Sequence, residues 1–296
     1  MTDKYAEPLI GVDRYAVVGN PIAHSKSPQI HQAFARQFRN TDTPQNISYE
    51  AKKAPIDGGF DNFVSNLRTQ GYKGVNITVP FKFDALKFVF KHGSVMPLAN
   101  RARAVNTMIF SEDGSIIGHN TDGVGLVNDI KKNLKFGVAG KKVLLLGSGG
   151  AAFGVLQPIV ETNPSIIIIS NRTFAKAEEA AKIISELIDT SQSKTECMAK
   201  RFDELGDMEF DLVINSTSTG LTDTALPIPN TIFAKNCLAY DMMYGRETPF
   251  MAQARANGAQ VADGLGMLVE QAAEAFYIWR GVRPKTAPVI EQLRNA

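Results

Sequence analysis

The sequence predicts an α/β protein with two α/β domains, one of which has a doubly wound, Rossmann-type parallel sheet. Short apolar segments alternate with amphipathic segments from end to end, and this alternation is typical of right-handed βαβ units and mostly parallel sheets. A glycine-rich turn at 147–152 joins an apolar segment directly to a helical one, as in doubly wound sheets. A length of 296 residues suggests two domains of ordinary size or one large domain.

The expected strands are short, rich in branched apolar residues, and closed by glycine, proline or polar residues. Asp113-Gly114 lies between two of them and predicts a hairpin turn there. In chain order the strands cover residues 15–19, 47–51, 75–79, 107–110, 115–118, 142–146, 166–170, 212–215 and 238–241.

The expected helices carry apolar residues three and four positions apart, which places one apolar stripe against a core. Phe60, Phe63, Val64 and Leu67 are an example of this spacing. In chain order the helices cover residues 28–38, 60–67, 81–91, 123–132, 151–162, 173–188, 248–257, 265–279 and 288–294.

Composition excludes several classes of protein. Lys and Arg number 32 against 30 for Asp and Glu, so no large basic field for nucleic acid is expected. Cys197 and Cys237 are the only cysteines, too few for a disulfide framework. The longest apolar runs, 143–146 and 166–169, are far shorter than the ~20 residues that cross a bilayer. Residues 1–9 mix charged and apolar groups, unlike a secretory signal, so a cytoplasmic protein is expected.

The turn at 147–152, GSGGAA, matches the dinucleotide-binding pattern G-x-G-x-x-A. Gly147 allows a tight turn after the strand, and Gly149 lets the backbone approach a pyrophosphate. The following helix contributes free N–H groups and its dipole, and Ala152 permits close packing of helix on strand. The pattern therefore predicts a dinucleotide site, with a purely structural glycine turn as the alternative.

The end of the next strand indicates which dinucleotide is bound. An NAD site has a carboxylate there to accept from the ribose 2′-hydroxyl, but this chain has the segment 170–176, SNRTFAK. Arg172 can pair with a 2′-phosphate, and Lys176 is a second cation one turn later. Cations oppose the dipole at a helix start, so an anionic ligand explains them better than solvent. The segment therefore favours NADP.

The loop 20–28 is polar and follows the first strand. Ser25 and Ser27 place two hydroxyls at a helix entrance, where they can hold a small carboxylate with the help of helix N–H groups. Ser27 ahead of Pro28 is equally typical of a helix N-cap, so both interpretations stay open. His24 and His31 do not have a metal-ligand spacing, and no metal site is expected.

Polar residues also interrupt the strand 75–79. Asn76 and Thr78 share one face of it, and a buried amide or hydroxyl needs a partner, which a polyol substrate could be. Lys82 follows at the carboxyl end of the strand, where open α/β sheets bind ligands. Asp122 is either a helix N-cap ahead of Gly123 or a carboxylate that handles protons. With Lys82 it would form an acid–base pair whose titration belongs to both groups.

Taken together, these motifs resemble the shikimate dehydrogenases. The resemblance covers roughly residues 15–281, and many members have a second arginine where this chain has Lys176. The matching segments are GNPIAHSKSP at 19–28, GVNITVPFK at 74–82, AVNT at 104–107, GHNTDG at 118–123, GSGGAA at 147–152, NRT at 171–173, NSTSTG at 215–220, YDMMYG at 240–245 and DGLGMLVEQAAEAFYIWRG at 263–281.

The resemblance implies reversible reduction of 3-dehydroshikimate to shikimate with NADPH, in the shikimate pathway of aromatic amino acid biosynthesis. Lys82 and Asp122 match the catalytic acid–base pair. The implied substrate contacts, which also include that pair, are Ser25, Ser27, Asn76, Thr78, Asn106, Tyr244 and Gln271. The cofactor-binding residues expected from the fingerprint, the Arg172 segment and the resemblance are Gly147, Ser148, Gly149, Gly150, Ala151, Asn171, Arg172, Thr173, Lys176, Thr217, Ser218, Gly264 and Met267.

The resemblance also implies the domain layout and the partners. A substrate domain covers 1–121 and is completed by 264–296, and an NADP-binding Rossmann domain, 122–263, is inserted between these parts. Residues 264–266 could serve as a hinge. The small-molecule substrate is the expected partner, with no nucleic acid and no membrane, and the chain is expected to be a monomer or a homodimer.

Three alternative functions remain. A quinate/shikimate dehydrogenase that prefers NAD is disfavoured by Arg172 and by the missing carboxylate. The methylenetetrahydrofolate dehydrogenases share the two-domain layout, but the serine pair and the Lys82–Asp122 combination favour the shikimate type. A non-catalytic regulator that senses NADP or a metabolite is disfavoured because both of these residues are present and no DNA-binding module is appended.

Overall fold

The computed structural model describes residues 11–191, 193–219 and 224–295. Two sequence predictions concern residues outside this description. They are the expected absence of a secretory signal at 1–9 and Gly220 at the end of the NSTSTG segment. The chain separates into two compact units. Of the described residues, the first unit contains those up to Asn100, Ala104–Asn120 and the C-terminal part from Ala272, and the second contains Arg101–Arg103 and those from Thr121 to Gln271.

The first unit is built on a mixed sheet with the strand order β2-β1-β3-β5-β6-β4. β3 and β5 pair antiparallel, as do β5 and β6, whereas β2, β1 and β3 are parallel. The strands are β1 (Asp13–Gly19), β2 (Ile47–Lys53), β3 (Tyr72–Ile77), β4 (Ser94–Val95), β5 (Thr107–Phe110) and β6 (Ile116–His119). The helices are α1 (Ser27–Gln37), α2 (Phe60–Thr69), α3 (Lys82–His92), α4 (Pro97–Arg101), the end of α9 (Leu265–Arg280) and α10 (Ala287–Arg294).

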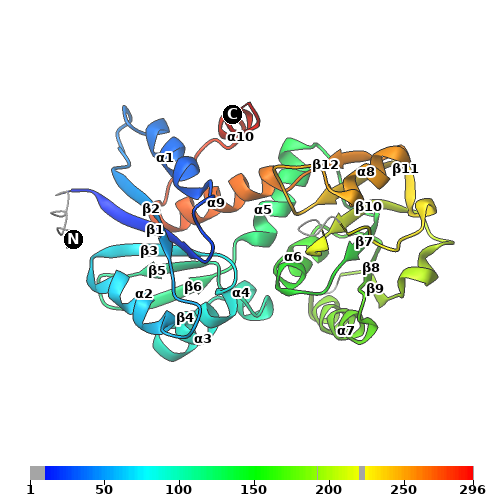
Figure 1. Cartoon of the computed structure of the whole chain (residues 1–296), viewed down its shortest axis with the longest axis horizontal. Coiled ribbons are helices and arrows are strands. Elements are labelled where there is room, and N and C mark those ends of the chain that lie inside the picture. The colour runs from blue at the N-terminus through cyan, green and yellow to red at the C-terminus, as the bar shows by residue number, and fades with distance from the viewer. Residues whose placement is uncertain (1–10, 192, 220–223, 296) are drawn as a thin grey trace. The chain divides into compact units, whose positions relative to one another are not determined.

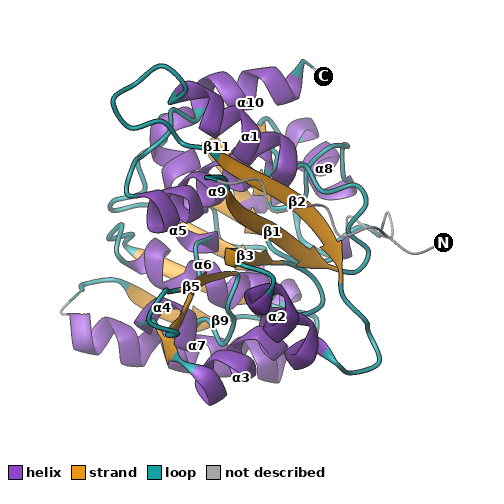
Figure 2. Ribbon diagram, turned by 90° about the vertical axis from the view of Figure 1, so that its left-hand side faces the viewer, coloured by secondary structure: helices purple, strands orange, loops and turns teal. Residues whose placement is uncertain are grey.

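The alternation of side chains along β1 explains why both faces of this sheet are covered. Ala16 and Val18 belong to a core with residues of α2 and α3, whereas Tyr15 and Val17 pack on the opposite face with Trp279 of α9. Figures 1 and 2 show α2 and α3 on one side of the sheet and α1, α9 and α10 on the other. The Trp279 indole N–H also donates to the Met108 carbonyl at 3.0 Å, which fixes α9 to the sheet.

The second unit is built on a parallel sheet with the order β12-β11-β10-β7-β8-β9. The strands are β7 (Lys142–Leu146), β8 (Ile166–Ser170), β9 (Glu196–Ala199), β10 (Phe210–Asn215), β11 (Phe233–Asp241) and β12 (Gln260–Ala262). The helices are α5 (Asp122–Asn128) with a π-helical turn (Asp129–Asn133), α6 (Gly150–Val160), α7 (Phe174–Ser191), α8 (Pro249–Ala256) and the start of α9, and short 3₁₀ turns cover Phe202–Leu205 and Asn230–Ile232.

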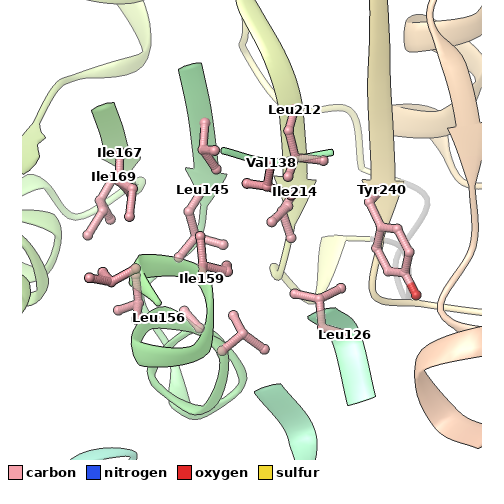
Figure 3. Packing of buried hydrophobic residues seen from close by; sticks show 14 of the residues in the cluster. Leu126, Val138, Leu145, Leu156, Ile159, Ile167, Ile169, Leu212, Ile214 and Tyr240 are labelled. Atoms are coloured by element: carbon pink, nitrogen blue, oxygen red, sulfur yellow. The ribbon is translucent and has the colours of Figure 1, made fainter. Parts of the chain in front are cut away.

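This strand order confirms the predicted Rossmann-type sheet. Counted from β7, it is the doubly wound order, which reverses between β7 and β10, and ligands of such sheets bind at that point. Strand alternation again fills both faces, since Leu145 packs toward α5, α6 and α7 while Leu144 and Leu146 pack toward α8. Figure 3 shows Leu145, Ile167 and Ile214 directed with their neighbours toward the helix that carries Leu156 and Ile159.

The predicted strand 75–79 is too long at its carboxyl end. β3 stops at Ile77, although the Thr78 backbone N–H still donates to the Val18 carbonyl at 2.9 Å. Val79 is 63% exposed. Pro80 has no N–H for the sheet and restricts the residue before it. β4, α4, β9 and β12 were not predicted, because they are too short or too exposed to give an apolar run.

The alternative interpretation of Ser27 and Asp122 as N-caps is wrong by one residue, because both residues already lie in the first helical turn. Lys26 and Thr121 are the capping positions of α1 and α5, and neither accepts a side-chain capping hydrogen bond. The Ser27 backbone N–H instead donates to the Ser25 hydroxyl at 3.3 Å. A turn that Ser25 closes therefore leads into α1.

The division into units differs from the predicted domains, 1–121 with 264–296 and 122–263, mainly at two places. The start of α9 belongs to the second unit, because a side chain on Gly125 would lie 2.8 Å from the Gln271 backbone nitrogen and the Met267 carbonyl oxygen. Arg101 and Arg103 belong there through polar contacts, since Arg101 donates to Gln157 at 2.9 Å. Arg103 forms an ion pair with Glu179 at 2.9 Å.

In the described ranges, no helix combines the length and the apolar character that a membrane span needs.

Candidate active site

The glycine-rich turn between β7 and α6 is shaped by close contacts within the second unit. Gly147 has φ +103°, and a side chain there would lie 2.6 Å from the Ser216 hydroxyl, so only glycine fits. Its N–H donates to the Ser170 carbonyl at 2.8 Å. Gly149 and Gly150 are exposed and have nothing within 4 Å of an added side chain. The turn thus leaves open space at the start of α6, where helix N–H groups favour an anion.

Two buried serine hydroxyls lie at this edge of the sheet. Ser148 and Ser170 are buried at 7% and 0% exposure, and neither hydroxyl has a hydrogen-bond partner among the described residues. Buried hydroxyls are normally paired, so partners from a bound nucleotide would satisfy them. Together with the open glycine turn, these two hydroxyls fit a dinucleotide at the predicted position. Ala151, also predicted there, is exposed on the first turn of α6.

The segment after β8 carries the predicted cationic groups in accessible positions. Arg172, Thr173 and Lys176 are exposed. Asn171 is half-buried, and its side-chain amide donates to the Thr173 carbonyl at 2.9 Å, which closes the turn into α7. This turn presents a guanidinium and an ammonium group at the end of β8, beside the strand that carries the glycine turn.

The loops after β10, β11 and β12 contain the predicted cofactor contacts Thr217, Ser218 and Gly264 and the predicted substrate contact Tyr244. Thr217 is half-buried, and Ser218 is exposed. Tyr244 is half-buried, and burial raises the pKa of its hydroxyl above the usual value. Gly264 donates from its N–H to the Met243 carbonyl at 2.8 Å, which ties the loop after β11 to the start of α9.

Residues at the start of α9 and α5 pack closely within the second unit. Met267 is 6% exposed and belongs to the hydrophobic core, whereas Gln271 is half-buried. Asp122, at the start of α5, is 2% exposed. A side chain on Gly123 would lie 2.5 Å from both the Gly154 carbonyl oxygen and the Pro158 ring. This close packing holds the helix that carries Asp122 firmly on α6.

In the first unit, Asn76 is the centre of a polar cluster at the end of β3. Its amide oxygen accepts from the Tyr49 hydroxyl at 2.7 Å, and its amide nitrogen donates to the Thr107 hydroxyl at 2.9 Å and the Asn106 carbonyl at 3.3 Å. Thr107 in turn donates to the Asn106 side chain at 2.9 Å. Protein groups thus supply partners for both ends of the Asn76 amide, so its partial burial does not by itself require a ligand.

Tyr49 is a member of this cluster that the sequence motifs did not identify. It is 3% exposed on β2 and stacks on the ring of His31, with centroids 4.1 Å apart. Burial raises the pKa of its hydroxyl well above the usual value, and the Ser27 hydroxyl acts in the opposite direction. The sequence shows only a tyrosine on a predicted strand, because the register that places Tyr49 opposite Tyr15 of β1 comes from the structure.

The remaining predicted residues of the first unit also lie at the carboxyl ends of its strands. Ser25 is half-buried in the turn that follows β1, and Ser27 is half-buried in the first turn of α1. Thr78 and Lys82 are half-buried after β3. Lys82 begins α3, and its carbonyl accepts from the Val105 N–H at 3.0 Å. Lys82 and Asp122 belong to different units, so their pairing stays a prediction.

Three family models cover most of the chain. The substrate-binding domain of shikimate dehydrogenase matches residues 17–108, a shikimate/quinate 5-dehydrogenase model matches 129–222, and the C-terminal domain of shikimate 5'-dehydrogenase matches 264–294. The first match contains the serine loop and Lys82, and the second contains the glycine turn and Arg172.

Named relatives match nearly the whole chain. It is 56% identical to the shikimate dehydrogenase (NADP(+)) of Methylobacillus flagellatus, over 96% of this chain and 100% of that protein. It is 49% identical to the protein of the same name from Dechloromonas aromatica, over 95% of this chain and 97% of that protein.

Solved structures agree with the sequence relatives. An Ael1 enzyme from Pseudomonas putida has a TM-score of 0.85 and 43% identity, with 95% of this chain and 98% of that chain covered. The shikimate 5-dehydrogenase of Thermus thermophilus, solved with NADP(H) and shikimate, has a TM-score of 0.80 and 31% identity, with 96% and 99% covered. The chain therefore belongs to the shikimate dehydrogenase family.

Proposed function

We propose that this protein catalyses the reversible reduction of 3-dehydroshikimate to shikimate with NADPH, with Lys82 and Asp122 as the acid–base pair. The observation that carries the proposal is the Rossmann-type sheet whose second strand, β8, is followed by Arg172 rather than by a carboxylate. It occurs in a chain 56% identical to a protein named shikimate dehydrogenase (NADP(+)). The same identity argues against the folate-type dehydrogenases and the non-catalytic regulator.

In the second unit, the proposal assigns the cofactor to the edge where β7, β8 and β10 end. The glycine turn and the first N–H groups of α6 would hold the pyrophosphate, and Ser148 offers a buried hydroxyl without a partner among the described residues. Arg172 and Lys176 would hold the 2′-phosphate, the guanidinium through its planar fork and the ammonium as a point charge. Loop residues Thr217 and Ser218 complete this assignment.

The first unit would bind the substrate. Ser25 and Ser27 are assigned to the carboxylate, because both hydroxyls lie at the entrance of α1. Asn76, Thr78 and Asn106 are assigned to the ring hydroxyls, and from the second unit the assignment adds Tyr244 and Gln271. Gly264 and Met267 are assigned to the nicotinamide side, where the buried Met267 would contribute shape rather than charge.

The roles of Lys82 and Asp122 follow from the charge that develops during reduction. NADPH supplies the hydride, and negative charge then builds on the carbonyl oxygen at C3. The Lys82 ammonium would stabilise that oxygen and donate a proton to it. The Asp122 carboxylate would keep Lys82 in its charged form and accept a hydrogen bond from a neighbouring substrate hydroxyl.

The test of this function is an assay with shikimate and quinate, each with NADP+ and NAD+, in which nicotinamide absorbance is followed. We expect the highest kcat/KM for shikimate with NADP+. A higher kcat/KM for quinate, or for NAD+, would instead assign the protein to the quinate-using or NAD-preferring type. The proposal also includes a cytoplasmic monomer or homodimer, which cell fractionation and size-exclusion chromatography test.

Replacing Arg172 by alanine is expected to raise KM for NADP+ roughly tenfold. A hydrogen bond to a charged group contributes about 1.5–3 kcal/mol, and exposure of Arg172 keeps the effect at the low end because solvent screens it. KM for NAD+ should stay unchanged, since NAD+ lacks the 2′-phosphate. Lys182→Ala, an exposed cation on α7, the helix that follows Arg172, is the matched control. An Arg172→Ala variant with an unchanged ratio of the two KM values would contradict this role.

A further inference from the structure

A buried carboxylate connects two loops of the second unit at the carboxyl edge of its sheet. Asp241 ends β11 and is 0% exposed. One of its oxygens accepts from the Asn215 amide at 3.0 Å and from the Thr248 hydroxyl at 2.6 Å. The other accepts from the Met243 backbone N–H at 2.9 Å. A single carboxylate thus contacts the end of β10, the loop after β11 and the N-cap of α8.

Asn215 continues this network into the loop after β10. It is 0% exposed and lies opposite Asp241 in the register of β10 and β11. Its amide oxygen accepts from both the backbone N–H and the hydroxyl of Thr217, at 3.1 and 2.7 Å. The Thr217 hydroxyl lies 2.7 Å from that of Thr219. The conformation of the start of this loop, residues 216–219, therefore depends on which end of the Asn215 amide faces Asp241.

Stability alone does not explain a carboxylate at this position. Burial raises the pKa of Asp241, and the hydrogen bonds from Thr248, Met243 and Asn215 counteract this effect. Buried charges are costly to desolvate, and apolar residues of similar size often stabilise a fold as well or better. A fully paired network, in contrast, orders the groups that it joins. The expected benefit is a fixed geometry for the two loops.

We propose that Asp241 is a positioning residue, which acts through Asn215 and Met243 to hold the loops after β10 and β11 in the conformation that receives the cofactor. This inference rests on the proposed function, which assigns Thr217, Ser218 and Tyr244 of these loops to the site. Loops ordered before binding lose less conformational entropy on binding, and affinity increases accordingly.

Asp241→Asn is the direct test, because it preserves size and removes the charge. Its new amide nitrogen would face either the Asn215 nitrogen or the Met243 N–H, donor against donor. If Asn215 turned over, the same conflict would move to the Thr217 N–H. We expect the Kd for NADP+, measured by isothermal titration calorimetry, to rise roughly tenfold. That loss corresponds to about 1.4 kcal/mol, within the usual cost of leaving a buried donor without an acceptor.

The exchanged pair Asn215→Asp with Asp241→Asn is the rescue variant. In it, the amide nitrogen at position 241 can donate to both the carboxylate at position 215 and the Thr248 oxygen, while the amide oxygen at 241 accepts from Met243. The carboxylate at position 215 then accepts from Thr217 as the wild-type amide does. Every donor of the two loops has an acceptor again, so the Kd for NADP+ should return to within about threefold of the wild-type value.

Thr248→Val is the matched control, since it removes one donor to Asp241 but leaves the links to both loops. We expect it to lower the melting temperature through loss of the α8 N-cap, with an unchanged Kd for NADP+. If Asp241→Asn lowers the melting temperature and leaves the Kd unchanged, Asp241 is structural only and the inference is wrong. An exchanged pair that binds no better than the single variant contradicts it equally.

Two further results keep the test decisive. If Asp241→Asn does not fold, Asn215→Ala keeps the carboxylate and removes its link to Thr217, and a Kd for NADP+ equal to wild type would then overturn the inference. A wild-type chain that does not bind NADP+ at all would contradict the proposed function. Failure of that function is thus distinguishable from failure of the positioning role.

Discussion

Lys82→Ala is expected to lower kcat for shikimate oxidation by roughly 10²–10⁴-fold, the usual cost of removing a general acid–base group. In the proposed mechanism no other group both neutralises the developing charge and exchanges the proton. The side chain is half-buried on the first turn of α3, so its truncation leaves the core of the first unit unchanged. The fold and the Kd for NADP+ should therefore stay close to wild type, as circular dichroism and calorimetry can measure.

The matched control is Lys87→Ala, an exposed lysine on the same helix whose ammonium lies over the Phe83 ring. It removes the same charge from α3, and its kcat should match the wild type. Near-normal turnover in Lys82→Ala, or an equal loss in both variants, would reject the assignment of Lys82 as the acid.

The proposed acid–base pair also predicts the kcat of a variant in which both Lys82 and Asp122 are replaced. If the two groups act as one unit, Asp122→Asn combined with Lys82→Ala should cost little more in kcat than Lys82→Ala alone. If the losses multiply, the two residues act independently and the acid–base pair is wrong. Because Asp122 is 2% exposed, the melting temperature of each variant must be measured beside its rate.

Strands inside the sheets were predictable because burial on both faces leaves a continuous apolar run. Residues 142–146 and 166–170 lie in the middle of the parallel sheet and match β7 and β8. The edge strands β9 and β12 are partly exposed and gave no such run. Single-sequence patterns report the burial of a segment, and an edge strand is ordered mainly by its neighbour.

Candidate site residues were predictable where the local chain geometry requires them. Gly147 is an example, since its positive φ follows from a tight strand-to-helix turn. The partners of Asn76 and Asp241 were not predictable, because Tyr49 and Asn215 lie 27 and 26 residues away along the chain. Only the register of neighbouring strands brings those side chains together.

The stability of the first unit is expected to decrease as pH falls, because of His31. Its ring is 0% exposed, and neither ring nitrogen has a hydrogen-bond partner among the described residues. Burial lowers the pKa of His31 to about 3, with the nearby Asn76 amide acting in the opposite direction. In the unfolded chain the pKa is about 6.5. Between these values the unfolded chain binds one more proton, so the free energy of unfolding decreases as pH falls.

The expected loss between about pH 8 and pH 5 is about 2 kcal/mol, at a full slope of roughly 1.4 kcal/mol per pH unit. The only tryptophan, Trp279, lies 5.5 Å from the His31 ring, so its fluorescence during urea unfolding reports this unit. His31→Phe removes the titrating group and should abolish that part of the pH dependence.

Phe34→Leu separates titration from packing. Phe34 is 0% exposed and contacts the His31 ring edge-on, at 6.0 Å between centroids, so its truncation weakens the same cluster without removing a proton site. The free energy of unfolding of Phe34→Leu should be lower than that of the wild type by the same amount at pH 8 and at pH 5. His31→Phe should instead reduce the difference between the free energies of unfolding at pH 8 and pH 5. If that difference in His31→Phe equals the wild-type difference, His31 is protonated within the folded unit, and its burial does not exclude the charge.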